Sequence, residues 1–205
     1  MNTKKRIIEE ALVLFSERGY SDVYVGDIAK AVGIKAPSLY KHFKNKQEIF
    51  EAILEELKSS YAEQALSIGI HGNNVSADAG IYTEISEEKL IEIGKNLFLY
   101  FLHDNHMRLF RKLLTLEQFH NSELANLYSR QYFDDPMTYQ GGLFKLLIAT
   151  GKFKNVDTQV LALQFYAPIY TLLTVCDRDS GREQEALRLL EAHIRQFNAN
   201  YLEDK

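Results

Sequence analysis

The sequence is poor in the residues that cross-link or kink a chain. Cys176 is its only cysteine, so no internal disulfide can form, which fits a reducing compartment. Only three prolines interrupt 205 residues, and apolar residues recur at helical spacing along most of the chain. The length allows a core that needs no structural metal for stability. We therefore expect an all-α protein, and the sequence suggests no cofactor.

Long hydrophobic runs are also missing. The basic start, Lys4-Lys5-Arg6, is followed by Glu9 and Glu10, which interrupt the apolar core that a signal peptide requires. The apolar runs over 97–102 and 143–148 are too short to span a bilayer. We expect no membrane segment and a cytoplasmic location.

Net negative charge is unevenly distributed. The chain carries a formal charge of −4, but its first 50 residues hold nine Lys or Arg against six Asp or Glu. That part is +3 and the remainder −7. A basic head on an acidic body suggests that only the head contacts a polyanion such as nucleic acid.

The periodicity and capping residues predict a succession of helices. Residues 66–82 contain several glycines and asparagines with weak periodicity, and are expected to form a loop. Asp134-Asp135-Pro136 is interpreted as a helix start, with an acid as cap and proline in the first turn. The helices are expected over 3–18, 25–32, 36–42, 46 to at least 57, 87–103, 106–119, 122–132, 135–150, 158–176 and 182–201.

The stretch 27–43 has the spacing of a helix-turn-helix. Ala29 lies where two helices would cross closely, and Gly33 lies in the turn, where a positive φ favours glycine. Leu39 and Phe43 would anchor the second helix to the first. The residues left facing outward are short or basic and suit a major groove: Lys35, Pro37, Ser38, Lys41 and His42. The alternative is an ordinary helical corner without a DNA role.

The flanking residues strongly resemble those of the TetR family of repressors. The resemblance rests on Leu39-Tyr40-Lys41-His42-Phe43-Lys44-Asn45-Lys46 followed by Glu48-Ile49-Phe50, and on the upstream Phe15-Ser16-Glu17-Arg18-Gly19-Tyr20 and Asp27-Ile28-Ala29. It covers about the first quarter of the chain. It implies an N-terminal three-helix helix-turn-helix domain over 1–47 and a larger helical effector-binding and dimerisation domain over 48–205.

The resemblance also implies individual DNA contacts. Tyr40 is expected to contact a phosphate with its hydroxyl, and Lys46 to contact another at a helix start. Lys4 would reach the flanking backbone. The family usually has Ser or Thr just before the second helix, whereas Val23 and Tyr24 stand here. That departure weakens the expected cap, although the Tyr24 hydroxyl could still donate to a phosphate.

Aromatic residues at helical positions are frequent beyond residue 50. Tyrosine combines an apolar body with a polar tip and is often found in pockets, although ordinary core packing explains most such residues. The expected pocket residues are Phe98, Phe101, Phe110, Leu114, Tyr128, Tyr132, Tyr139, Phe165 and Ile169.

The last two predicted helices, 158–176 and 182–201, are the candidates for a homodimer interface. The first is apolar nearly all round and needs cover on more than one side. Burial within one subunit is the alternative explanation.

No catalytic or metal-ligand motif stands out. His103 and His106 could share a helix face, with His120 further on, but core or exposed histidines are the simpler explanation. We expect a non-enzymatic regulator, a repressor released from a palindromic double-stranded DNA operator by an unknown small molecule. A regulator controlled by a protein partner, an activator, and a helical protein that does not bind DNA are the alternatives.

Overall fold

The computed structural model describes residues 2–203, which fold into helices grouped in two compact units. The first unit comprises residues 1–61 and 104–128, and the second comprises 62–103 and 129–205. No strand forms within the described range; a single antiparallel bridge joins Phe153 to Leu202. The all-α prediction is confirmed. The units do not follow the boundary expected at residue 47, because residues 48–61 and 104–128 pack with the N-terminal helices.

The first unit is built around α1 (Thr3–Arg18), which packs against α2 (Val25–Val32) and α7 (Asn105–Glu117). The apolar stripe of α1 is fully buried at positions spaced three and four apart, as amphipathic helices require. α3 (Ala36–Leu39) packs against α2, and α4 (Lys46–Ser67) begins in this unit. α8 (Ser122–Ser129) ends at its boundary.

A carboxylate from α7 fixes the C-terminus of α1. Glu117 is buried, and its Oε1 accepts a hydrogen bond from the Tyr20 amide at 2.9 Å. Gly19, at φ 85°, lies so close that a Cβ there would be 2.4 Å from the same oxygen. Glycine is therefore required at this position for both conformation and space.

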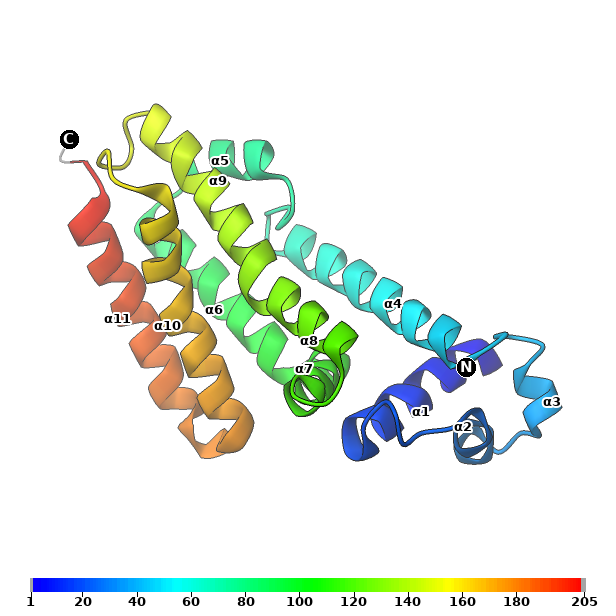
Figure 1. Ribbon diagram of the computed structural model, residues 1–205. Coiled ribbons are helices and arrows are strands. Elements are labelled where there is room, and N and C mark those ends of the chain that lie inside the picture. Colours follow the sequence, from blue (N-terminus) through cyan, green and yellow to red (C-terminus); the bar gives the residue numbers. More distant parts are fainter. Residues whose placement is uncertain (1, 204–205) are drawn as a thin grey trace. The chain divides into compact units, whose positions relative to one another are not determined.

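The second unit packs α9 (Asp135–Ala149) between α5 (Val75–Glu84) and α10 (Thr158–Arg178), while α11 (Glu183–Tyr201) packs on α6 (Glu87–His103) and α10. Figure 1 shows α10 and α11 side by side, running in opposite directions. Asp157 caps α10 by accepting from the amides of Gln159 and Val160, as the sequence predicts.

Two expectations for the helices were wrong. Residues 75–82, predicted as part of a loop, belong to α5, because Asn74 caps this helix and the glycines at 69 and 72 confine the turn before it to a few residues. The buried carboxylate of Asp78 then fixes that turn, accepting from the amides of His71 and Gly72 and from the Tyr139 hydroxyl.

The second expectation was wrong only in the cap: α9 begins at Asp135, as predicted, but Asp134 does not cap it. Asp134 is helical at φ −67° and ψ −49°, and its side chain makes no cap hydrogen bond. The chain stays helical from α8 through a π-helical turn, Arg130–Asp134, into α9. Pro136 lies in the first turn of α9, directly after the π-turn.

α10 contradicts the sequence-based expectation that the chain has no segment long and apolar enough to span a membrane. The helix has 21 residues, and an 18-residue stretch of it has a mean hydropathy of 1.4, so length and composition alone would let it cross a membrane. Such a single helix is weak evidence, since core and interface helices share these properties. Only 22% of that apolar stretch is buried in the single chain, so α10 presents an uncovered apolar face.

Candidate nucleic-acid interface and ligand cavity

The turn between α2 and α3 has the geometry of a helix-turn-helix. Gly33 adopts the left-handed conformation at φ 76° and ψ 31°, and the Ile34 amide donates to the Ala29 carbonyl at 2.9 Å. Ala29 is buried at the crossing, and Leu39 and Phe43 anchor the segment after the turn. The three anchoring roles assigned from sequence to Ala29, Leu39 and Phe43 thus agree with their observed burial.

Substituting Gly33 should therefore destabilise the turn. Nothing lies within 4 Å of a Cβ placed there, so Gly33→Ala meets only backbone strain. We expect its free energy of unfolding to fall by about 1 kcal/mol. Gly26→Ala is the matched control in α2, since its Cβ also meets open space and its φ is not positive. Urea denaturation should show a loss for the first variant only.

The outward surface of the α3 segment carries most of the predicted DNA-contact residues. α3 is shorter than predicted, ending at Leu39 with turns over 40–42. Tyr40 is 53% exposed and Tyr24 70% exposed. Lys4 is exposed with its ammonium 5.4 Å from the centre of the Phe43 ring. Lys35, Pro37, Lys41 and His42 are exposed, and Ser38 is half-buried.

The Lys46 ammonium is bound to other groups of the protein and does not extend into solvent toward a phosphate. Its Nζ donates to the Tyr20 carbonyl at 2.6 Å and lies 4.3 Å from the centre of the Tyr20 ring. Burial lowers the pKa of Lys46, opposed by the charges of Glu117 and Asp22. The ammonium thus joins the start of α4 to the end of α1; its expected phosphate contact stays a prediction.

The start of α2 is capped without the usual Ser or Thr. The Tyr24 side chain makes no cap hydrogen bond. Instead the Asp27 carboxylate, three residues into the helix, accepts from the Tyr24 amide at 2.9 Å, and Arg18 lies 3.5 Å away. Both lower the pKa of Asp27, the amide hydrogen bond most. The start of α2 therefore has one of the two hydrogen bonds of a capping box, the one in which an acidic side chain of the first turn accepts from the amide of the preceding cap residue.

This cap should make the domain sensitive to acid. Because the pKa of Asp27 is lower in the folded state, its stabilisation is present above the ordinary value of about 3.8 and disappears as pH falls through the lowered value. Asp27→Asn should therefore be less stable than wild type at pH 7, with a smaller gap at a pH below 3.8. Urea denaturation at both values measures it, with exposed Asp22→Asn as control. An equal gap at both values would contradict this assignment.

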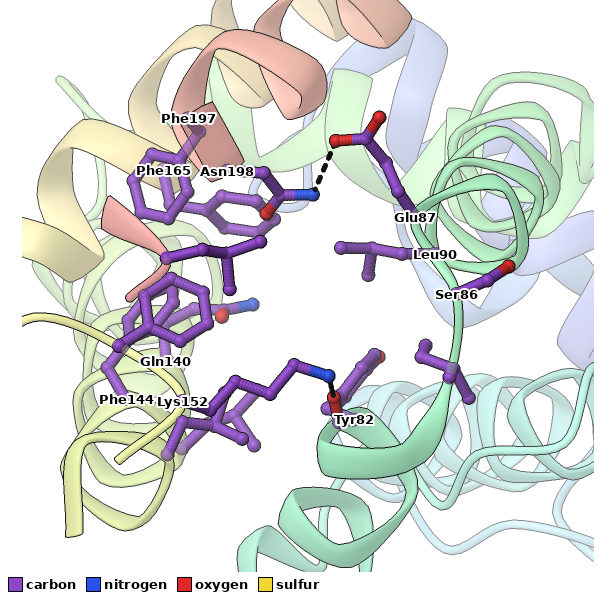
Figure 2. Close-up of a pocket in the computed structure, with 15 residues that line it drawn as sticks. Tyr82, Ser86, Glu87, Leu90, Gln140, Phe144, Lys152, Phe165, Phe197 and Asn198 are labelled. Carbon is purple, nitrogen blue, oxygen red and sulfur yellow. Dashed lines mark hydrogen bonds between the residues drawn. The ribbon is translucent and has the colours of Figure 1, made fainter. Parts of the chain in front are cut away.

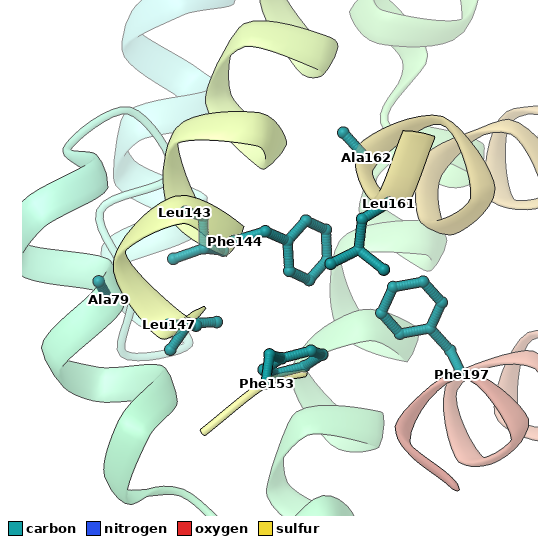
Figure 3. Packing of buried hydrophobic residues seen from close by; sticks show 8 residues of the cluster. All are labelled: Ala79, Leu143, Phe144, Leu147, Phe153, Leu161, Ala162 and Phe197. Carbon is teal, nitrogen blue, oxygen red and sulfur yellow. The ribbon is translucent and has the colours of Figure 1, made fainter. Parts of the chain in front are cut away.

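The second unit contains a cavity between the end of α5, the start of α6, α9 and α11 (Figure 2). Its volume is about 100 Å³, enough for several water molecules. Its wall is mostly aromatic and aliphatic (Figure 3), and its polar and charged side chains include Glu87, Gln140, Lys152 and Asn198.

Of the nine pocket residues predicted from sequence, only Phe165 lines this cavity. Phe110 and Leu114 are buried in the first unit, where Phe110 packs 6.3 Å from Phe50. Tyr139 is held by Asp78. Phe98 is in a separate core cluster, against which Phe101 and Ile169 pack; Tyr132 stacks on Tyr170; and Tyr128 is half-buried in the first unit.

The cavity residues that sequence analysis missed come from distant segments. Lys152 directly follows Gly151, where α9 has ended, and Gln140 lies within α9. Neither has a local motif around it, so only the folded arrangement brings them together. Among residues 2–203 no group of three or more His, Cys, Asp or Glu is arranged to hold a metal, and His103 instead pairs with Glu183 at 3.1 Å.

The fold and the exposed α3 segment define a helix-turn-helix protein, and comparison with known proteins narrows the class. Residues 7–53 match the profile of the family described as bacterial regulatory proteins, tetR family. The match covers the helix-turn-helix and the helices that flank it, and so supports the resemblance to TetR-family regulators seen in the sequence. Proteins of this family bind DNA and are not enzymes, in agreement with the non-enzymatic expectation.

Among curated proteins, the chain is similar to IcaR, the negative transcriptional regulator of the biofilm operon icaADBC. It is 31% identical to the Staphylococcus epidermidis protein over 123 residues, 60% of either chain. It is 40% identical to the Staphylococcus aureus protein over 76 residues, covering 37% of this chain and 40% of that protein. The chain thus spans about 60% and 40% of these relatives.

Solved structures share the whole fold. The complex of SmeT with triclosan superposes with a TM-score of 0.74 at 17% identity, covering 98% of this chain and 92% of that chain. SmeT is the repressor of a Stenotrophomonas maltophilia multidrug efflux pump. A transcriptional regulator from Saccharomonospora viridis in complex with choline has a TM-score of 0.63 at 21% identity, covering 98% of both chains.

Proposed function

We propose that the protein is a homodimeric, cytoplasmic repressor that binds a palindromic DNA operator and releases it when a small molecule occupies its helical body. The observation that carries the proposal is the exposed, basic segment after the Gly33 turn. Two such segments in a symmetric dimer would enter successive major grooves about 34–36 Å apart. The similarity to IcaR, named a negative regulator, supports repression as the direction of the effect.

The dimer is proposed to form through α10 and α11. Val160 and Leu163 of α10 are 51% and 45% exposed, and Leu189 of α11 is 36% exposed. Ala192 is exposed one turn further along α11. A matching pair of helices from a second copy would cover these apolar side chains, since a symmetric interface uses the same patch twice. This also gives the apolar α10 a role other than crossing a membrane.

Effector control is proposed from the cavity in the second unit. Solved relatives of the same fold were captured with triclosan and with choline. A ligand that binds one conformer of the body better than another shifts the population between them, and weakens operator binding by the same free energy.

The test is binding to duplex DNA followed by fluorescence anisotropy. Fragments from upstream of the protein's own coding region and of neighbouring genes should include one bound about 10³-fold more tightly than random duplex at physiological salt. Uniform binding to every fragment, or no binding in dilute buffer, would overturn the proposal.

A further inference from the structure

Residues 28–47, from α2 to the start of α4, contain lysines and no acidic residue. The lysines are Lys30, Lys35, Lys41, Lys44 and Lys46. Such a concentration of positive charge attracts a polyanion, but an ammonium can neutralise a phosphate only when it is not already bound within the protein. Lys44 and Lys46 lie two residues apart in the chain, and the structure places their ammonium groups in opposite surroundings.

The Lys46 ammonium is held by the protein on three sides. Its Nζ donates to the Tyr20 carbonyl at 2.6 Å, lies 3.5 Å from the Ser21 carbonyl and lies 4.3 Å from the centre of the Tyr20 ring. An ammonium has three donors, and these three partners match that number. The carboxylates of Glu117 and Asp22 attract the same group. Turning it outward to a phosphate would therefore break several contacts at once.

The N-terminus of α4 also carries a negative charge of its own. Asn45 Oδ1 accepts from the Glu48 amide at 2.8 Å, and Glu48 Oε2 accepts from the Lys44 amide at 2.5 Å. The Glu48 carboxylate thus occupies the end of the helix where an anion is favoured. A phosphate placed directly on this helix start would meet a charge of its own sign, so we expect a phosphate to lie beside the helix start.

The Lys44 ammonium is available for that position. Its side chain is exposed, and within residues 2–203 its ammonium has no hydrogen bond or ion pair. Its main chain is fixed, because the preceding Phe43 is buried and its own amide is held by Glu48. Only the side chain of Lys44 would lose freedom on binding, which keeps the entropic cost small. A lysine of this kind binds phosphate as a point charge.

We propose that Lys44 is the cation that binds a DNA phosphate at the start of α4, and that Lys46 ties this helix start to the end of α1. The inference deepens the proposed function and rests on it, because it assigns one contact of the proposed DNA interface. It gives two neighbouring lysines of equal charge separate roles, one toward DNA and one within the protein.

The experiment compares Lys44→Met with Lys46→Met, since methionine keeps a long unbranched side chain and removes the ammonium. Anisotropy titrations between 50 and 200 mM salt use the DNA fragment that the wild type binds most tightly, and urea denaturation without DNA measures stability. In a dimer Lys44→Met removes two cations, so the slope of log affinity against log salt should flatten by about 1.8, with the wild-type urea midpoint. Lys46→Met should keep the wild-type slope and lower the urea midpoint, because the Tyr20 carbonyl loses its donor.

Lys58→Met is the matched control. It removes one positive charge per subunit from an exposed position of α4, where Lys58 pairs with Glu55, and should change neither slope nor midpoint. If Lys46→Met is too unstable to bind DNA, Lys44→Met still decides the assignment, because its exposed side chain has no core contact to lose.

Three results would overturn the inference: a wild-type slope in Lys44→Met, a flattened slope in Lys46→Met, or a wild-type urea midpoint in Lys46→Met. Each of them leaves the proposed function intact, since the wild type still binds DNA. Failure of the proposed function is a different result, in which the wild type binds no fragment even in dilute buffer, and that result removes this inference as well.

Discussion

Replacing Lys35 and Lys41 together with alanine should reduce affinity for every DNA duplex by at least about 100-fold. Both side chains are exposed on the segment after the Gly33 turn, with no core contact to lose. In a dimer the double variant removes four cations. If each neutralises a phosphate, the slope of log affinity against log salt should flatten by about 3.6. Anisotropy titrations between 50 and 200 mM salt measure both quantities.

The control for this prediction is Lys58→Ala. Lys58 is exposed in the same unit and pairs with Glu55 on α4, away from the α2–α3 turn. It removes one positive charge per subunit, half as many as the double variant, from outside the segment, so general loss of positive charge predicts half the effect and loss of specific contacts predicts none. Wild-type affinity and slope in the double variant would show that this segment does not meet DNA.

Placing charge on the uncovered face of α10 should give a monomer. Val160→Glu with Leu163→Glu introduces two carboxylates at positions already half exposed in the single chain, so folding of the subunit should be preserved. In a dimer the same groups would be buried without partners, which costs several kcal/mol. Light scattering after gel filtration should then report 23.6 kDa rather than twice that mass.

Loss of the dimer should also weaken DNA binding, because two linked reading segments gain about 10² to 10⁴ in affinity over one. Leu66→Glu, an exposed leucine of α4, is the matched control and should leave mass and affinity unchanged. A dimer that persists in the double variant would exclude this face as the interface.

An element of the fold could be predicted from the sequence where the residues that stabilise it lie close together in the chain. Gly33 and Asp157 act on neighbours within a few residues, so the turn and the α10 start could be predicted. α5 could not, because its stability depends partly on Asp78 accepting from Tyr139, 61 residues away. Asp134-Asp135-Pro136 resembled a helix start since its local chemistry is the same whether the helix begins or passes through a π-turn.

The candidate sites divide in the same way. Most of the predicted DNA-contact residues lie within one short segment, 35–42, where all but the half-buried Ser38 are exposed; Lys46 turns inward to Tyr20, and the contacts themselves stay predictions. The cavity draws on five helices and the loop after α9, so of the residues chosen for aromatic content only Phe165 lies in its wall. Phe110 and Leu114, attractive as pocket residues by composition, were needed for the core of the first unit.

The bridge between Phe153 and Leu202 brings Leu202, after the end of α11, into the wall of the cavity beside Lys152. Two main-chain hydrogen bonds, from Lys154 to Tyr201 and from Glu203 to Lys152, must break before a protease can cleave within residues 201–203. The rate of cleavage there therefore reports how often this part of the cavity wall opens. Any compound that binds in the cavity should slow this cleavage, whatever the chemical class of the compound.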